Sequence, residues 1–434
     1  MGNKIENLPS VKKKTSVADW PKYLGFMFVG LIVLPMMFRE PFIKWAFGNY
    51  ISCINCIMVY VTVMLLVTKR DYTKEEVLLC IIWLLLLIPL WLSNEKNSFL
   101  RVLAEIMQCW MPVFLIIQRI DEERREKLVR ISLYFIDVFT LLLLAIAIYE
   151  KLTGVSMVKA MEAAFTARGY RCSDLTILTN LMVVDTRFFS LWGHPLTNAV
   201  YFNAFFILND IYYRSIEKRY PKFLFFLVAV CGVALAGSKT GIVVIGLALV
   251  ITNWDNKKWF ILYAAAAVAL YFAGVFDMVV KRFTTQPLTT GRFTSLQVYF
   301  REGIYPLRFF VGYGVKTTYC PELIHLKAGF EFPLLMFALD NGILFSVTFL
   351  GSMFFYYTRR FLKAGQVKSW LMISLLFAEI NTYNGISLYN QDCGWINAVI
   401  LMLALNSVSL AKPQELKRRQ KTVKRADKQQ VVSG

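Results

Sequence analysis

Twelve apolar runs, each close to the length needed to cross a lipid bilayer, divide this chain. A helix needs about 20 apolar residues to cross the hydrocarbon layer, which is about 30 Å thick. Only 18% of the residues are charged, whereas a soluble domain carries about 25%. The sequence therefore predicts an all-α fold, a polytopic transmembrane helical bundle of about 12 spans. The runs are centred near Ile32, Met58, Leu85, Met107, Leu141, Phe205, Val228, Leu247, Val268, Leu344, Leu376 and Leu401.

Two of these runs, the seventh and the eighth, are short. They meet at the sequence GSKTG, Gly237 to Gly241. Two interpretations stay open for them: two separate spans, or a broken or re-entrant pair. The other connections are mostly short, which is typical of antiparallel neighbours in a bundle.

The distribution of Lys and Arg predicts the orientation, because cytoplasmic connections carry an excess of both. With the N-terminus inside, the cytoplasmic segments hold 31 of the 48 Lys and Arg residues. Those segments are residues 1–22, 69–76, 118–130, 213–222, 253–258, 358–368 and 412–434.

We therefore expect three regions: a basic cytoplasmic tail over residues 1–22, a single transmembrane domain over residues 23–411, and a polybasic cytoplasmic tail over residues 412–434. The first 20 residues lack an apolar core followed by a cleavage site, so they are interpreted as a retained tail,. The polybasic tail is expected to contact anionic membrane lipids. Nucleic acid is not an expected partner.

Two connections on the outer side are much longer than the rest, residues 150–192 and 277–332. Long loops in a compact domain are usually functional or disordered, and these two are rich in aromatic residues. Phe293, Leu296 and Phe300 recur at helical spacing, which predicts a short amphipathic helix at the outer interface,. Both loops are expected to carry short helices of this kind.

Cations gather in these loops, where basic residues are normally sparse. Arginine suits a diphosphate because its planar fork donates two parallel hydrogen bonds and keeps its charge. The alternative is that these side chains only reach lipid headgroups. Lys239 in GSKTG is a further candidate phosphate contact, although Ser238 interrupts the spacing of an ATP-binding loop,.

The chain has two histidines, His194 and His325, and the topology places both on the outer side. They are too few for a zinc site without well-spaced carboxylates, so no metal is expected. Either could act as a general base or a hydrogen-bond donor, and interface packing is the alternative.

Four carboxylates fall within apolar runs, where burial is costly unless they face the bundle interior or a wet cavity. Asp340 and Glu379 lie towards the outer half, where a substrate cavity would open. Glu105 and Asp137 are instead expected to form structural pairs with Lys, Arg or Tyr.

The order of several short motifs resembles that of bacterial O-antigen ligases and Wzy-type polysaccharide polymerases, over roughly residues 180–350. Each motif is weak alone, and the ordered set is more specific. In two places the chain departs from the pattern: no Trp follows Arg292, and no Asn follows His325, so Glu331 could occupy that functional position. The matching residues are Arg187, His194, Pro195 and Asn198, then Ser238 to Gly241 with Lys239 in place of Arg, then Gly291 and Arg292, Gly312 to Val315, His325, and Asp340 to Ile343.

This resemblance implies a metal-independent inverting glycosyltransferase on the outer face of the bacterial cytoplasmic membrane. The donor would be an undecaprenyl-diphosphate-linked oligosaccharide, and no cofactor would be needed. The diphosphate would be bound by Arg187, Lys239, Arg292 and Arg301. His325 or Glu331 would position or deprotonate the acceptor hydroxyl. The expected substrate-cavity residues are His194, Asn198, Asp340 and Glu379.

The preferred interpretation is a polymerase that joins lipid-linked repeat units of O-antigen, capsule or exopolysaccharide. A ligase that transfers the glycan to a different acceptor is the first alternative, and a flippase or other transporter is the second. A cell-wall polymerase of the shape and elongation type ranks last. A chain-length regulator and a flippase are further candidate partners.

Overall fold

Helices are the regular structure of the described part of this chain, and it contains no strand. The structure is a computed structural model. It describes residues 72–169, 179, 187–189, 194–255, 258–285, 292–303, 305–314, 332–382 and 393–411. The predicted all-α class is confirmed for these residues. The runs centred near Ile32 and Met58 and both tails lie outside them.

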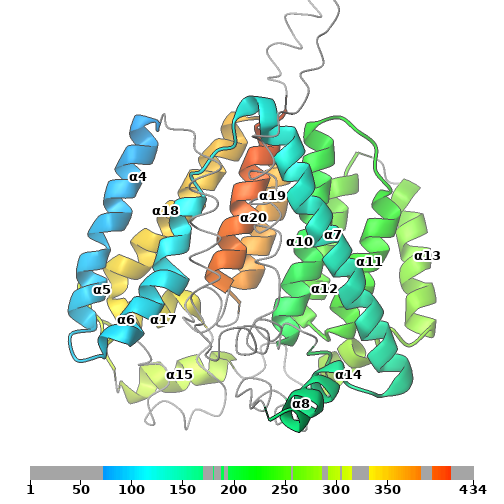
Figure 1. The fold of residues 1–434 in the computed structure, drawn as a ribbon, viewed down its shortest axis with the longest axis horizontal. Coiled ribbons are helices and arrows are strands. Elements are labelled where there is room, and N and C mark those ends of the chain that lie inside the picture. The colour runs from blue at the N-terminus through cyan, green and yellow to red at the C-terminus, as the bar shows by residue number, and fades with distance from the viewer. Residues whose placement is uncertain are drawn as a thin grey trace, which may run out of the picture.

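Long helices run up and down between two ends of the molecule, and shorter ones lie across the lower end in Figure 1. The upright helices are α4 (Lys74–Leu85), α5 (Leu87–Ser93), α7 (Glu122–Thr153), α10 (Pro195–Ser215), α11 (Lys222–Leu235), α12 (Lys239–Asn253), α13 (Lys258–Phe272), α18 (Ile343–Lys363), α19 (Val367–Ile380) and α20 (Cys393–Val408). At the lower end are α6 (Phe99–Glu105), α8 (Met157–Ala167), α14 (Asp277–Thr285), α15 (Arg292–Glu302) and α17 (Pro333–Asn341).

Two helices are long and apolar enough to cross a membrane: Lys74–Ser93, which joins α4 and α5, and α7. A third candidate is the pair α13 and α14, which is bent by 83° between its two parts. Helices α11, α12 and α20 are apolar but shorter. The described residues therefore support an apolar helical bundle without confirming twelve spans.

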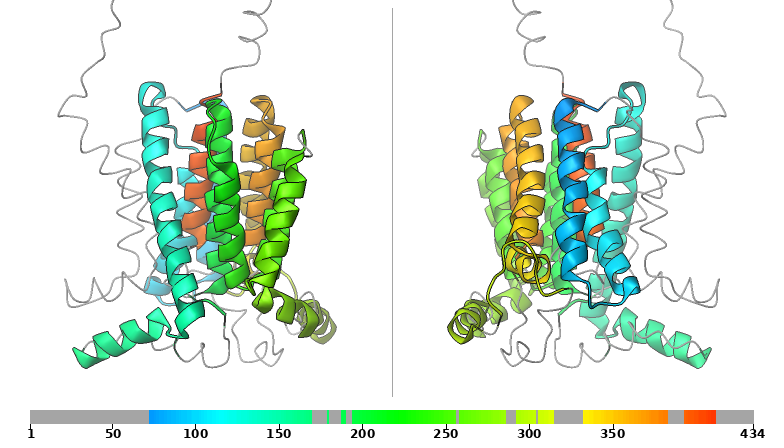
Figure 2. Two further views of the ribbon diagram at one scale, coloured as in Figure 1. Left: turned by 90° about the vertical axis from the view of Figure 1, so that its right-hand side faces the viewer. Right: turned by 90° about the vertical axis from the view of Figure 1, so that its left-hand side faces the viewer.

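The core is centred on α20, in which every residue is buried. It lies between a group formed by α4, α5, α17 and α18 and a group formed by α7 and α10 to α13 (Figures 1 and 2). Most of α10 is buried as well. These two apolar helices have few outward-facing positions, as expected for helices that are surrounded by protein.

The fourth apolar run does not form one α-helix. After α6 it continues as a π-helix, Ile106–Trp110, and then as a 3-10 helix, Met111–Leu115. Irregular backbone of this kind leaves carbonyls unpaired, and α20 satisfies some of them. The Trp395 indole donates to the Met107 carbonyl over 3.0 Å, and the Asn406 amide donates to the Gln118 carbonyl over 3.1 Å.

Within the described residues, the segments that the charge pattern assigns to one side of a membrane meet at one end of the molecule. Ion pairs join them: Arg119 with Glu76, Arg359 with Glu75, Lys218 with Glu126, and Lys368 with Asp255. At the other end, Lys151 pairs with Asp277 over 3.6 Å. Residues from the predicted short connections therefore gather at one end, and Lys151 and Asp277, from the two predicted long loops, pair at the other.

Candidate functional site

A tight turn joins α11 to α12 at the sequence GSK. Gly237 adopts a left-handed conformation with φ +64°, which a glycine adopts without strain,. Ser238 then caps α12, because its hydroxyl accepts a hydrogen bond from the Gly241 amide over 3.0 Å,. The two short apolar runs are therefore two helices joined by a turn, an arrangement that fits both interpretations left open for this sequence.

Three cations surround this turn, and we call Arg187, Lys239 and Arg282 the Gly237 cation cluster. The stem of Arg187 lies 3.3 Å from the position that a Cβ at Gly237 would occupy. Arg282 donates from Nη1 to the Gly237 carbonyl over 2.6 Å. Lys239 is the first residue of α12, and its Nζ lies 5.4 Å from the centre of the Phe283 ring.

The bend between α13 and α14 is what brings Arg282 to the turn. Helix α14 leaves the direction of α13 by 83° and packs across the lower ends of α11 and α12, as Figure 1 shows. A Cβ at Gly237 would also lie 2.9 Å from Met278 of α14, so the absence of a side chain allows this close packing.

The electrostatics of the cluster favour an anion. Lys239 and Arg282 are close enough for their charges to repel one another, and the N-terminus of α12 adds a partial positive charge. Oxyanions bind at helix N-termini and to arginine forks. The arrangement can therefore bind a phosphate or diphosphate and stabilise negative charge on it.

Two of the predicted diphosphate residues, Arg187 and Lys239, thus meet at one turn. Of the other two, Arg301 is exposed in the last turn of α15. Arg292 begins α15, the short helix expected in the second loop, but its side chain lies outside the described residues. Arg282 was not predicted from the sequence, because nothing in the spacing distinguishes it from the exposed Lys281 beside it.

Asn198 acts on the backbone next to Arg187. Its amide donates to the carbonyls of Phe188 and Phe189 over 2.9 and 3.0 Å, and the side chain is fully buried. Asn198 therefore holds the segment that follows Arg187. His194 lies between them in sequence and precedes the first turn of α10 without capping it through its side chain.

Glu379 lies on the inner side of the same turn. Its Oε2 accepts a hydrogen bond from the Asn203 amide over 2.8 Å, and the Asn203 amide also donates to the Gly241 carbonyl over 3.2 Å. Its Oε1 lies 3.1 Å from the position of a Cβ at Gly241. Glu379 is thus within about one helical turn of Lys239 along α12. Asn203 of α10, which was not predicted from the sequence, thus connects α12 with α19.

Asp340 belongs to a second assembly, in which two of the resemblance motifs are joined through their backbones. The amide of Tyr313 donates to the Leu339 carbonyl over 2.8 Å, and that of Gly314 donates to the Asp340 carbonyl over 2.9 Å. A Cβ at Gly312 would overlap the backbone of Leu339 and Asp340. The G-Y-G and D-N-G sequences therefore form one structural unit.

A buried polar network contacts this unit. The Asn341 amide donates to Glu105 over 2.6 Å, and Asn94 contacts both side chains. The Gly312 amide donates to the Ser93 hydroxyl over 2.8 Å. The network connects the G-Y-G segment to α5 and α6.

The predicted pairing of Glu105 and Asp137 with Lys, Arg or Tyr is wrong. Asn341 and Asn94 bind Glu105, and Asn209 donates to Asp137 over 2.7 Å. An amide donor satisfies a buried carboxyl without bringing a second charge into the interior, which a Lys or Arg would do.

The two predicted catalytic candidates, His325 and Glu331, lie outside the described residues. No group of three His, Cys, Asp or Glu side chains gathers within the described ranges in a way that could hold a metal ion.

Comparison with known proteins identifies no relative of this chain. No protein-family model, curated protein or solved structure matches the chain.

Proposed function

We propose that the chain is a membrane-embedded glycosyltransferase that polymerises lipid-linked oligosaccharide repeat units. The observation that carries this proposal is the convergence of Arg187, Lys239 and Arg282 on the turn at Gly237. Three cations and a helix N-terminus at one place suit a diphosphate better than they suit a neutral ligand.

The membrane location is supported by apolar surface that water would not favour. Side chains such as Ile261, 77% exposed, and Phe272, 82% exposed, lie on the outside of α13. Continuous apolar surface of this kind is typical of contact with lipid. We place the chain in the bacterial cytoplasmic membrane, with both termini in the cytoplasm and the lower end of Figure 1 outside.

In the proposed reaction, the acceptor hydroxyl attacks the anomeric carbon of the donor glycan from the face opposite the diphosphate. The new glycosidic bond forms as the bond to the diphosphate breaks, with inversion of configuration. The acceptor proton passes to a base, for which His325 and Glu331 are the candidates. The Gly237 cation cluster stabilises the charge that develops on undecaprenyl diphosphate as it leaves.

The donor already carries its activated leaving group, so the proposal requires neither a nucleotide nor a metal. Arg292 and Arg301 would contribute further contacts from α15. A ligase would use the same donor site with a different acceptor, and the described geometry favours neither polymerase nor ligase.

One observation favours the alternative of a transporter. The irregular run of a π-helix and a 3-10 helix after Glu105 resembles the interrupted helices on which many transporters build their substrate sites. A flippase that moves the same lipid-linked glycan would also bind its diphosphate.

An assay with purified protein tests the proposal. The protein in nanodiscs is given a lipid-diphosphate-linked oligosaccharide and a chelator, without nucleotide, and products are separated on a gel. A ladder spaced by one repeat unit would support the polymerase. Transfer only to an added core acceptor would mean a ligase. Movement of the lipid across a vesicle membrane, with no transfer to either acceptor, would replace the proposal with the flippase.

A further inference from the structure

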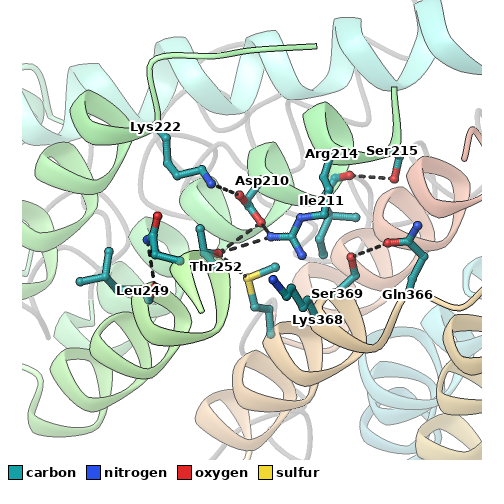
Figure 3. Close-up of polar contacts among 12 residues, drawn as sticks. Asp210, Ile211, Arg214, Ser215, Lys222, Leu249, Thr252, Gln366, Lys368 and Ser369 are labelled. Atoms are coloured by element: carbon teal, nitrogen blue, oxygen red, sulfur yellow. Dashed lines mark hydrogen bonds and ion pairs between the residues drawn. The ribbon is translucent and has the colours of Figure 1, made fainter. Parts of the chain in front are cut away.

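A buried aspartate at the upper end of the bundle is surrounded by cations and hydroxyl donors. Asp210, near the end of α10, has a side chain that is 1% exposed. It is paired with Arg214 and lies 3.6 Å from Lys222. Figure 3 shows it among Arg214, Lys222 and Thr252, and the Thr252 hydroxyl donates to it over 3.2 Å. It also accepts a hydrogen bond from the Tyr220 hydroxyl over 2.8 Å.

Arg214, Tyr220 and Thr252 donate hydrogen bonds to Asp210, whose two oxygens offer about four lone-pair positions, and Lys222 adds an ion pair,. Burial and the neighbouring Asp210 raise the pKa of Tyr220 above its ordinary value, so this hydroxyl keeps its proton and donates,. Most of the acceptor positions of Asp210 are therefore occupied. Nη1 of Arg214 is buried and has no hydrogen-bond partner in the part of the chain that the structure describes.

The local charge is positive. Lys368, at the start of α19, lies beside the same group, close enough to Lys222 for the two charges to repel one another. Its own partner is Asp255, whose side chain is 79% exposed. Three cations, Arg214, Lys222 and Lys368, thus face one buried carboxylate and one carboxylate in solvent.

The N-termini of α11 and α19 lie here, and so do the C-termini of α10 and α12, whose partial charge is negative,. Helices α11 and α19 begin here without a side-chain cap and without an acidic residue in the first turn. Lys222 is the first residue of α11 and Lys368 is the second residue of α19. A cation at a helix N-terminus is unfavourable, because the helix dipole places partial positive charge there. An anion among these groups would offset the repulsion.

Apolar surface lies along α12, on the side of the helix turned away from Thr252,. Val243, Leu247 and Val250 are exposed on α12 at spacings of four and three residues, which places them along one face of the helix,. Trp254 and Trp259 are exposed at the ends of α12 and α13 that lie next to Asp255. Tryptophan is enriched where a membrane meets water.

We propose that Arg214, Lys222 and Lys368 bind the phosphate of an anionic phospholipid, whose acyl chains lie on the exposed face of α12. This proposal rests on the membrane location within the proposed function, but not on glycosyl transfer. Basic groups between membrane helices on the cytoplasmic side suit such headgroups. The bound lipid would join the ends of α10, α11, α12 and α19.

The test measures thermal unfolding of the purified full chain in detergent while lipid is added. Phosphatidylglycerol is compared with phosphatidylcholine, which has the same phosphate but no net charge. A ligand that binds only the folded state raises the unfolding midpoint as its concentration passes the dissociation constant. We expect phosphatidylglycerol to raise the unfolding midpoint at a concentration roughly tenfold or more below the one that phosphatidylcholine requires.

A matched pair of double variants locates the effect. K222Q/K368Q removes two cations of the site and leaves the pairing of Arg214 with Asp210. K218Q/R219Q removes the same charge from the neighbouring connection between α10 and α11. We expect the first variant to lose most of the preference for phosphatidylglycerol and the second to keep it. The single variant K368Q should fold normally, since the partner of Lys368 is in solvent, and should show part of the loss.

An equal loss of the preference for phosphatidylglycerol in both double variants would overturn the proposal. General attraction between the basic surface and anionic lipid would then explain that preference. Stabilisation by inorganic phosphate alone, to the same extent, would also overturn it, in favour of a soluble anion. These outcomes are separate from the transfer assay, so the failure of one proposal is distinguishable from the failure of the other.

Discussion

The Asn203 amide on α10 donates to the Glu379 carboxyl on α19 over 2.8 Å, and both side chains are almost completely buried. The same kind of pair recurs between Asn209 and Asp137 and within the network around Glu105. Carboxyl groups paired with amides therefore connect the helices in three parts of the apolar core. Such buried polar contacts stabilise only when their partners are present, because an unpaired polar group in the interior is costly.

A double-mutant cycle tests the connection between α10 and α19. We expect N203L to lower the free energy of unfolding by about 1–3 kcal/mol, because Glu379 loses its donor. E379L should cost a similar amount. The double variant should recover part of the loss, since both polar groups are then replaced. Thermal unfolding in detergent measures all three, and strictly additive losses would show that the two side chains do not depend on one another.

The contribution of Arg282 to anion binding by the Gly237 cation cluster can be tested with Lys281 as the control position. We expect R282Q to weaken binding of the lipid-diphosphate donor by roughly tenfold or more, as for the loss of one charge-assisted contact. K281Q removes the same charge one position earlier, at an exposed site on the same helix, and should bind normally. The measurement is a titration of the donor against each purified variant.

Replacement of Arg187 tests whether the shape of the cation matters as well as its charge. We expect R187K to lose product formation almost as completely as R187A, because lysine cannot donate two parallel hydrogen bonds to a diphosphate. The protein should remain folded in the membrane in both cases. Full activity in R187K would mean that a point charge is sufficient, and normal polymer from R187A would remove Arg187 from the site.

The sequence was sufficient for the helical class, for the short helix after Gly291 and for the grouping of Arg187 with Lys239. The first two depend on local pattern, which is apolar length and helical spacing, whereas the grouping of Arg187 with Lys239 came from the family resemblance. The sequence was insufficient for Arg282, which reaches the site only through the bend between α13 and α14. It was also insufficient for the asparagine partners of Glu105 and Asp137, because residues such as Asn341, 236 positions from Glu105, meet their carboxyls only after the helices have packed.

At the upper end of the bundle, replacement of the buried Asp210 should destabilise the protein more than most other substitutions. We expect D210N to lower the free energy of unfolding by about 1–3 kcal/mol, because Arg214 and Lys222, which are 26% and 32% exposed, lose their carboxylate partner,. D255N is the control, since its carboxylate is in solvent and its unfolding midpoint should not change measurably. Similar midpoints for the two variants would show that Asp210 does not organise this end.

The raised pKa of Tyr220 should make the stability of the folded protein depend on alkaline pH. Its pKa is raised in the folded protein, so the unfolded chain releases the tyrosine proton first as the pH increases. The contribution of Tyr220 is therefore fully present below pH of about 10 and is lost above it. We expect Y220F to cost about 1 kcal/mol at neutral pH. The difference between the wild type and Y220F should then shrink between about pH 10 and 11, and a constant difference would contradict the assignment.

Two glycines in different surroundings test the joining of the G-Y-G and D-N-G sequences. A Cβ at Gly312 would overlap the backbone of Leu339 and Asp340, whereas a Cβ at Gly351 in α18 would meet nothing within 4 Å. We expect G312A to destabilise the protein by about 1–3 kcal/mol, because the added methyl group forces two backbone segments apart. G351A should be neutral or stabilising by up to about 1 kcal/mol, since alanine favours a helix over glycine. If unfolding midpoints show that G312A is tolerated as well as G351A, the two sequences are not in contact, and Asp340 would have to be placed independently of the segment that contains Tyr313.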